Sequence, residues 1–320
     1  MKLTPWPRVF AVALAGSAIL AVVVLAFLWP SVTSTVHNVP VAVVGDNPAL
    51  TSQLSDTFDI TTVADRGAAV AAIESREAYG AVVLGETPEV LTASANGAVV
   101  SQMFTSVASR LNTTATDVVP LASTDARGAG LSAMSFPLVI GGIAGGVIIS
   151  MLVTGVWRRL LTTALYGVGA GAVIVAITQG WFGILQGAVL PNIAAATMAV
   201  LAVSALIVGL TSIIGPAGIG VGAILTMFVG NQISGAVQPW QFLPEPWGVV
   251  GQFFAPGAGS TLMRNLSYFP EASTAQAWWV LAAWIAAGVA FMALGHQKAK
   301  TAGGSTVRAS STQEQERVAL

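Results

Sequence analysis

The chain has 320 residues, of which 54% are hydrophobic and only 8% are charged. An average soluble domain carries about 25% charged residues, so this chain has too few charges to cover its surface in water, and much of that surface must face lipid. The formal net charge of -1 gives no sign of a nucleic-acid partner. The absence of cysteine excludes disulfides and thiolate metal sites.

Residues 9–29 predict the first transmembrane helix, because about 20 mainly apolar residues cross the roughly 30 Å hydrocarbon core of a bilayer. Lys2 and Arg8 precede this run, and Pro30 ends it. A cleaved signal peptide is the alternative, but its apolar core is only about 7–15 residues long and ends at a small-x-small site. The longer run, with no such site after it, favours an uncleaved anchor within residues 1–30.

Residues 31–132 predict a water-exposed α/β domain, because they hold ten acidic and four basic side chains. Strands alternate with helices, which favours βαβ units around a small, largely parallel sheet. Asp65 and Asn96 stand where helix caps are expected. The predicted strands are residues 39–44, 59–63, 79–84 and 90–93, and the predicted helices are residues 47–58, 66–78 and 96–111.

Five further apolar runs bring the predicted spans to six, the fifth being short and glycine-rich. Basic residues gather at the cytoplasmic ends of spans. Here they precede span one, separate spans two and three, and follow span six. This pattern predicts an inner-membrane protein with both termini in the cytoplasm and the 31–132 domain outside. The five runs are residues 133–156, 160–179, 192–214, 218–233 and 275–294.

The long connection between the last two spans interleaves prolines with aromatic side chains, which favour the membrane interface. We therefore expect a re-entrant segment of short helices at about residues 236–270, within a five-helix transmembrane domain at residues 133–297. The Ser-, Thr- and Gln-rich segment 298–320 predicts a disordered cytoplasmic tail.

Motifs for chemistry are missing from the sequence. No lysine lies between Leu3 and Gln297, so the chain lacks the phosphate-binding G-x-x-x-x-G-K-[ST] loop. The predicted spans hold no ionisable residue away from their ends, where ion-coupled carriers need one. His37 and His296 fall on opposite sides of the predicted membrane, and no G-x-S-x-G elbow accompanies His37. We predict no catalytic, metal-binding or cofactor-binding residue and no enzymatic activity in this chain.

Two groups of charged residues are candidate sites. Arg158 and Arg159 occupy the tight turn between spans two and three, either as a topology anchor or as a contact for a cytoplasmic ATPase. Asp117, Asp125 and Arg127 lie where the outer domain rejoins the membrane, either as a structural clamp or along a substrate exit.

Glycine pairs at four-residue spacing let helices approach closely in lipid. They predict either packing within one subunit, which we favour, or a dimer seam or sliding transport interface. The pairs are Gly141/Gly145, Gly142/Gly146, Gly167/Gly171 and Gly218/Gly222.

The order of these segments resembles the membrane permease of type-2 ABC exporters, and especially the branch that includes the phage infection protein. The similar stretches are VPVAVVGDNPAL at residues 39–50, AAIESREAYGAVVL at 71–84, DVVPLASTDARGAGLSAMSFPLVIGG at 117–142 and FLPEPWGVVGQFFAPGAG at 242–259. The resemblance implies a homodimer that works with a cytoplasmic ABC ATPase. The chain departs from that family by lacking an amphipathic helix before span one and a longer coupling loop after span two.

Two functions follow as hypotheses. The first is a permease subunit that exports a lipid-like, drug-like or cell-envelope substrate with energy from a separate ATPase. The alternative is a non-transporting receptor or scaffold for cell-envelope assembly or phage attachment, which the small cytoplasmic surface favours.

Overall fold

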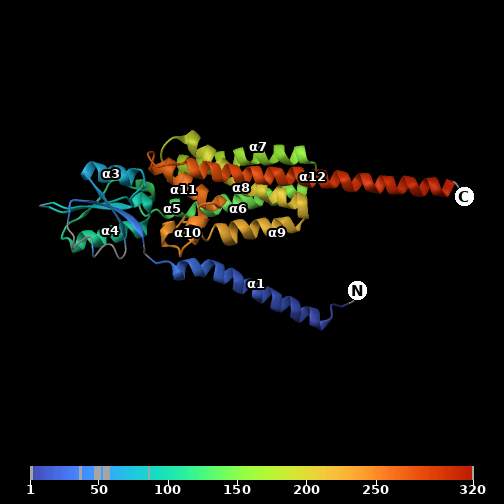
Figure 1. Cartoon of the computed structure of the whole chain (residues 1–320), viewed down its shortest axis with the longest axis horizontal. Helices are drawn as coiled ribbons and strands as arrows, with labels where there is room; N and C mark the ends of the chain where they lie inside the picture. Colours follow the sequence, from blue (N-terminus) through green and yellow to red (C-terminus); the bar gives the residue numbers. More distant parts are fainter. Residues whose placement is uncertain (1–2, 36–37, 47–51, 53–57, 86, 319–320) are drawn as a thin grey trace.

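The computed structural model describes the chain except for residues 1–2, 36–37, 47–51, 53–57, 86 and 319–320. Figure 1 shows an α/β domain at one end of a helical bundle, with helix α1 (Trp6–Thr33) beside the bundle and helix α12 (Ala275–Val318) extending beyond its other end. The predicted architecture of apolar helices with a small α/β insertion after the first helix is therefore confirmed. His37 and most of the predicted helix at residues 47–58 lie outside the described residues, and Phe58, its predicted last residue, belongs to a strand instead.

Within the described part of the chain, five helical stretches are long and apolar enough to cross a membrane. They make the chain a multi-pass membrane protein and agree with five of the six predicted spans. The fifth predicted span is a shorter helix, formed by α9 (Ala217–Ala223) and the π-helical segment η4 (Ile224–Gly230). At about 1.5 Å per residue it reaches about 21 Å, less than the roughly 30 Å hydrocarbon core. The five long stretches are Trp6–Pro30, Ala129–Leu152, Val156–Trp181, Val189–Ile214 and Ala275–Lys298.

The α/β domain holds a five-stranded sheet in the order β2-β1-β3-β4-β5. Neighbouring strands are parallel except β3 and β4, which are antiparallel. The prediction of a largely parallel sheet is therefore confirmed, and the one antiparallel pair follows from the short β3–β4 connection. A parallel crossover needs a dozen or more residues, whereas antiparallel neighbours need only a few. The strands are β1 (Val39–Val44), β2 (Phe58–Val63), β3 (Gly80–Val83), β4 (Glu89–Thr92) and β5 (Ala115–Asp117).

Alternating side chains bury both faces of this sheet. Val41 of β1 belongs to a core that includes Phe104 of helix α4 (Ala98–Arg110). Ala42 points to the other face, where Ile73 of helix α3 (Arg66–Glu74) belongs to a core that runs without a break into the helical bundle. The α/β domain and the bundle therefore share one hydrophobic core.

The predicted helix caps had different outcomes. Asp65 caps α3, since its carboxylate accepts a 2.8 Å hydrogen bond from the Ala68 amide. Asn96 does not cap α4. It ends the 3-10 turn η1 (Ser94–Asn96), and Gly97, with φ of 128°, is the N-cap residue instead. This backbone conformation suits glycine, and it leaves the Asn96 side chain free to point into the protein.

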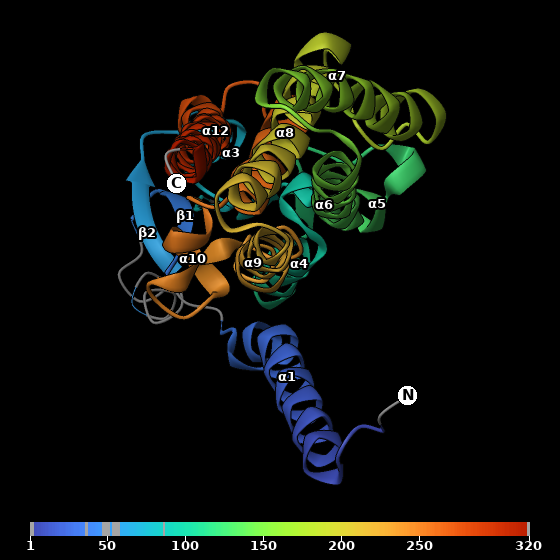
Figure 2. The ribbon, with the colours of Figure 1, turned by 90° about the vertical axis from the view of Figure 1, so that its right-hand side faces the viewer.

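Helix α8 (Val189–Ile214) is the centre of the bundle. It contacts α6 (Ser135–Leu152), α7 (Val156–Val175), α9 and α12, as the view along the bundle in Figure 2 shows. Gly146 of α6 faces Ile207 of α8, and Gly171 of α7 faces Thr197 of α8. These glycines pack helices within one chain, which is the interpretation that the sequence favoured.

Helix α1 stands apart from the bundle (Figure 2), and the 18-residue window that defines its span is 0% buried. Its contacts are near its end, where Phe27 lies 5.9 Å from Phe228 and Trp29 lies 6.0 Å from Trp247, measured between ring centroids. An apolar helix with this exposure needs lipid or another protein around it.

Helix α12 continues to Val318, so the segment predicted to be a disordered tail is helical. The last proline of the chain is Pro270, and a segment without proline can continue a helix that the bundle has already nucleated.

We predict that Gly171→Ala destabilises the bundle. The added Cβ would lie 2.6 Å from the Thr197 backbone nitrogen, which cannot move without shifting α8. Overpacking of this kind costs about 1–3 kcal/mol, so the purified protein should unfold at lower temperature in detergent. Gly169→Ala is the matched control on the same helix, because nothing lies within 4 Å of its Cβ position. Equal unfolding temperatures for the two variants would contradict the packing.

Candidate functional site

The site lies in the connection between η4 and α12, which contains the helices η5 (Trp240–Phe242), α10 (Trp247–Gly251) and α11 (Ala255–Tyr268). Helix α11 is buried along most of its length and contacts α8 and α12. Figure 1 shows α10 and α11 between the bundle and the α/β domain. Short proline-bounded helices are what the sequence predicted here.

Arg264 on α11 joins this connection to the α/β domain. Its side chain is only 8% exposed. Nη1 donates hydrogen bonds to the carbonyls of Ala95 and Asn96, at 3.2 and 2.6 Å, and Nη2 donates to the Ala236 carbonyl at 3.0 Å. The guanidinium therefore stabilises the end of η1 and the loop after η4 at the same time.

Arg76 brings a second guanidinium to the same place from the other side. It follows α3 with φ of 60°, and its Nε donates to the Asn96 side-chain oxygen at 3.1 Å while Nη1 donates to the Asn265 side-chain oxygen. The guanidinium carbon also lies 5.2 Å from the centre of the Phe269 ring. Cation–π contacts of this kind stabilise a cation away from water.

Burial, and after it the neighbouring Arg76, lowers the pKa of Arg264 to about 10. The guanidinium of Arg264 is therefore charged near neutral pH, although no carboxylate forms an ion pair with it or with Arg76 in the described residues. A buried guanidinium without a counter-ion, next to the half-buried guanidinium of Arg76, is costly to the fold. The hydrogen bonds to carbonyl and amide oxygens offset part of that cost.

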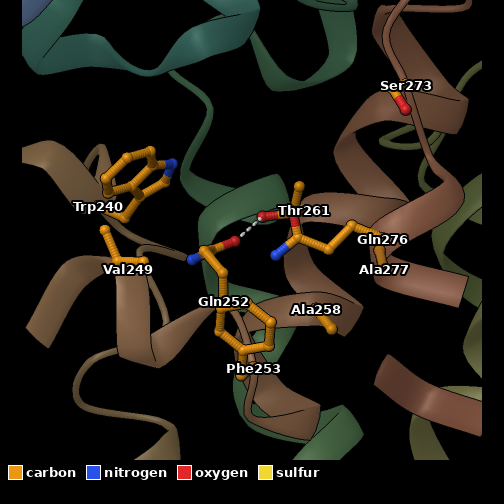
Figure 3. Close-up of a pocket in the computed structure, with 9 residues that line it drawn as sticks. All are labelled: Trp240, Val249, Gln252, Phe253, Ala258, Thr261, Ser273, Gln276 and Ala277. Atoms are coloured by element: carbon orange, nitrogen blue, oxygen red, sulfur yellow. Dashed lines mark hydrogen bonds between the residues drawn. The ribbon is translucent and has the colours of Figure 1, made fainter. Parts of the chain in front are cut away.

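A groove of about 340 Å³ opens beside this cluster, between α10, α11 and the start of α12 (Figure 3). Val249, Phe253 and Ala258 give it an apolar wall, and Phe253 is more than half exposed. Thr261 donates a 2.7 Å hydrogen bond to the Gln252 side-chain oxygen across the groove, as Figure 3 shows. The groove is therefore lined by polar side chains, those of Gln252, Thr261, Ser273 and Gln276, as well as by this apolar wall.

The structure separates the three residues of the predicted junction. The Asp117 carboxylate accepts from the Ser94 amide at 3.0 Å. The buried Asp125 carboxylate accepts from the amides of Gly130 and Leu131, at 3.0 and 2.8 Å, and so caps helix α5 (Ala129–Ala133). Arg127 is exposed, and no ion pair joins these residues within the described chain. The clamp is Arg264 instead.

The two arginines of the α6–α7 turn also differ. Arg159 turns inward: its Nε and Nη2 donate to the carbonyls of Val153 and Ser150, at 2.8 and 3.1 Å, and its Nη1 donates to the Ser212 hydroxyl at 3.0 Å. A cation at the C-terminus of α6 is favourable for the helix dipole. Arg158 is exposed, so only Arg158 is available for a partner.

Sequence reasoning missed Arg76, Asn96 and Arg264. Arg264 did carry a signal, because it is one of only five charged residues between positions 133 and 297, and an isolated charge in an apolar region points to a functional or structural role. Its partners could not be read from the sequence, since Asn96 is 168 positions away.

The chain matches no protein-family model, no curated protein and no solved structure. Its resemblance to the type-2 exporters therefore rests on the order and composition of its own segments. The function that this resemblance implies stays a prediction. The groove and the arginine cluster are the structural features on which it can be argued.

We predict that Arg264→Met loosens the α/β domain. It leaves three carbonyls without their donor, and each buried polar group left unpaired costs about 1–3 kcal/mol. The variant should unfold at lower temperature and its α/β domain should be cleaved faster by protease. Arg127→Met removes an exposed arginine from the same region and should leave both readouts near wild type. If Arg127 were the clamp, Arg127→Met would instead be the variant with the lower unfolding temperature and the faster cleavage.

Proposed function

We propose that the chain is the membrane permease subunit of an ABC-type exporter, which moves a lipid-like, drug-like or cell-envelope substrate outward with energy from a separate cytoplasmic ATPase. The observation that carries this proposal is the groove of about 340 Å³ beside the α/β domain. Its lining combines the apolar side chains of Val249, Phe253 and Ala258 with the polar side chains of Gln252, Thr261 and Gln276. A groove of this composition suits a molecule with an apolar tail and a polar head.

The proposed topology has six crossings, with both termini in the cytoplasm and the α/β domain outside the cell membrane. The short α9–η4 helix counts as a crossing in this proposal because it packs along α8 in the bundle. In this orientation the groove lies near the outer leaflet, where an exported amphiphile would leave. The exposed Phe253 and Trp247 suit the interface at that depth.

The energy source in this proposal is a partner. The sequence between Leu3 and Gln297 contains no lysine and hence no nucleotide-binding loop of the Walker type. Arg158 is the proposed contact for the ATPase, because it is exposed at the cytoplasmic turn of the proposed topology. A homodimer completes the proposal, since the exporters that the chain resembles work as pairs of permease subunits.

We predict that Arg158→Ala weakens ATPase binding without destabilising the protein. The affinity-purified protein from native membranes should retain several-fold less ATPase, as measured by mass spectrometry of the co-purified proteins. Arg159→Ala should instead lower the unfolding temperature, because three hydrogen bonds to α6 and α8 are lost. Wild-type protein that retains no ATPase would refute the partnership.

We also predict that Val249→Trp slows export by filling the groove. Val249 is about half exposed, so the larger side chain can be accommodated without repacking a core. Outward movement of a tail-labelled phospholipid in vesicles that hold the protein and its ATPase measures the effect. Val173→Trp adds the same volume at an exposed position of α7. Equal rates for both variants would remove the groove from the proposal, and binding of an envelope component without any transport would favour the receptor alternative.

A further inference from the structure

Asn96 has a hydrogen-bond donor with no acceptor. The residue is 2% exposed. Its side-chain oxygen must be the atom that faces Arg76, because a guanidinium can only donate. This fixes the orientation of the amide, and its Nδ2 group is left buried without a hydrogen-bond partner. A buried donor of this kind costs about 1–3 kcal/mol unless something accepts its hydrogen bond.

Asn96 lines a small cavity that both arginines also line, together with Tyr79, Trp240 and Thr261. The cavity leaves about 10 Å³ for the centre of a water-sized atom, which is room for one oxygen atom. Arg76 and Arg264 line this space and contribute positive charge. The cavity therefore has the size of one oxygen and the electrostatics of an anion site.

The cavity has no acidic lining residue. Glu77 and Glu271 are exposed and form no ion pair with either arginine in the described residues. The lining hydroxyls already donate elsewhere, Tyr79 to the Gln241 side chain at 2.9 Å and Ser260 to the Gly257 carbonyl at 3.0 Å. A water would satisfy Asn96 but would leave the buried Arg264 and the half-buried Arg76 without a counter-charge, whereas an anionic oxygen satisfies both requirements.

The cavity adjoins the groove, because Trp240 and Thr261 line both. A molecule with one anionic oxygen in the cavity can therefore continue along the apolar wall made by Val249, Phe253 and Ala258. The polar contact between Thr261 and Gln252 lies at the point where head and tail would meet.

We propose that Arg76, Asn96 and Arg264 form a binding site for the anionic headgroup of an amphiphile, a phosphate or carboxylate oxygen entering the cavity while the apolar chain occupies the groove. Naming this amphiphile as the exported substrate rests on the proposed function. The site itself does not, because binding is measured without ATPase or transport.

The test compares Asn96→Asp with Asn112→Asp in the full-length protein. Asn96→Asp keeps the shape of the side chain but replaces the donor with a carboxylate oxygen, which pairs with the arginines and repels an anion. Asn112 is exposed in the same α/β domain, and its φ of 49° is tolerated by both Asn and Asp. The probes are phosphatidylglycerol, phosphatidylcholine and inorganic phosphate, with retention of the lipids by the detergent-solubilised protein measured by native mass spectrometry.

We expect wild type and Asn112→Asp to retain phosphatidylglycerol over phosphatidylcholine. Asn96→Asp should lose that preference by about tenfold, the effect of about 1.4 kcal/mol. Its unfolding temperature should not fall, because the new carboxylate neutralises buried charge, whereas a merely structural Asn96 would give a less stable protein with unchanged lipid preference.

Inorganic phosphate separates the two sources of the anionic group. If phosphate alone raises the unfolding temperature of wild type but not of Asn96→Asp, the site binds free anions as well as headgroups. If only the lipid does so, the apolar chain is required. The proposal would be overturned if wild type retained both lipids equally and did not respond to inorganic phosphate. It would also be overturned if Asn96→Asp bound phosphatidylglycerol and inorganic phosphate as wild type does. Loss of transport with intact binding would instead count against export.

Discussion

The junction between the α/β domain and the helical bundle depends on one guanidinium group. Arg264 satisfies carbonyls from both sides, those of Ala95 and Asn96 in the α/β domain and that of Ala236 in the loop after η4. Those carbonyls lie in a 3-10 turn and in a loop, where a regular helix or strand would not supply their hydrogen-bond donors. A side chain with donors in several directions can bind all three, and arginine supplies five such donors. This contact, together with the packing of α11 on α8 and α12, fixes the position of α11 beside the α/β domain.

A second constraint keeps the α/β domain from moving as a free appendage. Ala42 and Ile73 of the domain belong to the same core cluster as Leu131, Val200 and other residues of the bundle. Displacing the domain would expose this shared core and break the arginine contacts together. Any event that alters the cavity between Arg76 and Arg264 therefore acts on the domain and on α11 at once, so the groove and the domain are mechanically coupled.

Local patterns allowed the sequence to predict most elements but not the site. Long apolar runs predict spans because hydropathy is a property of neighbouring residues, and β1 was predicted with its observed bounds for the same reason. The α9–η4 helix ends at Gly230, three residues before the predicted bound, because the polar Asn231 and Gln232 follow the apolar run. Asn96 was expected to cap α4 because asparagine favours that position, but Gly97 takes the cap, and the amide of Asn96 meets Arg76 through tertiary packing that no local pattern encodes.

The two arginines of the cluster have different relations to the cavity. Arg264 directs three hydrogen bonds to backbone carbonyls, so its role in holding the junction is complete without a ligand. Arg76 donates two hydrogen bonds, to the side-chain oxygens of Asn96 and Asn265. These neutral amide oxygens form weaker hydrogen bonds with a guanidinium than a carboxylate does. The side-chain oxygen of Asn96 accepts from Arg76, and its unpartnered Nδ2 group can bind only a hydrogen-bond acceptor. Arg264 therefore holds the walls of the cavity in place, while Arg76 and Asn96 favour an anionic oxygen inside it.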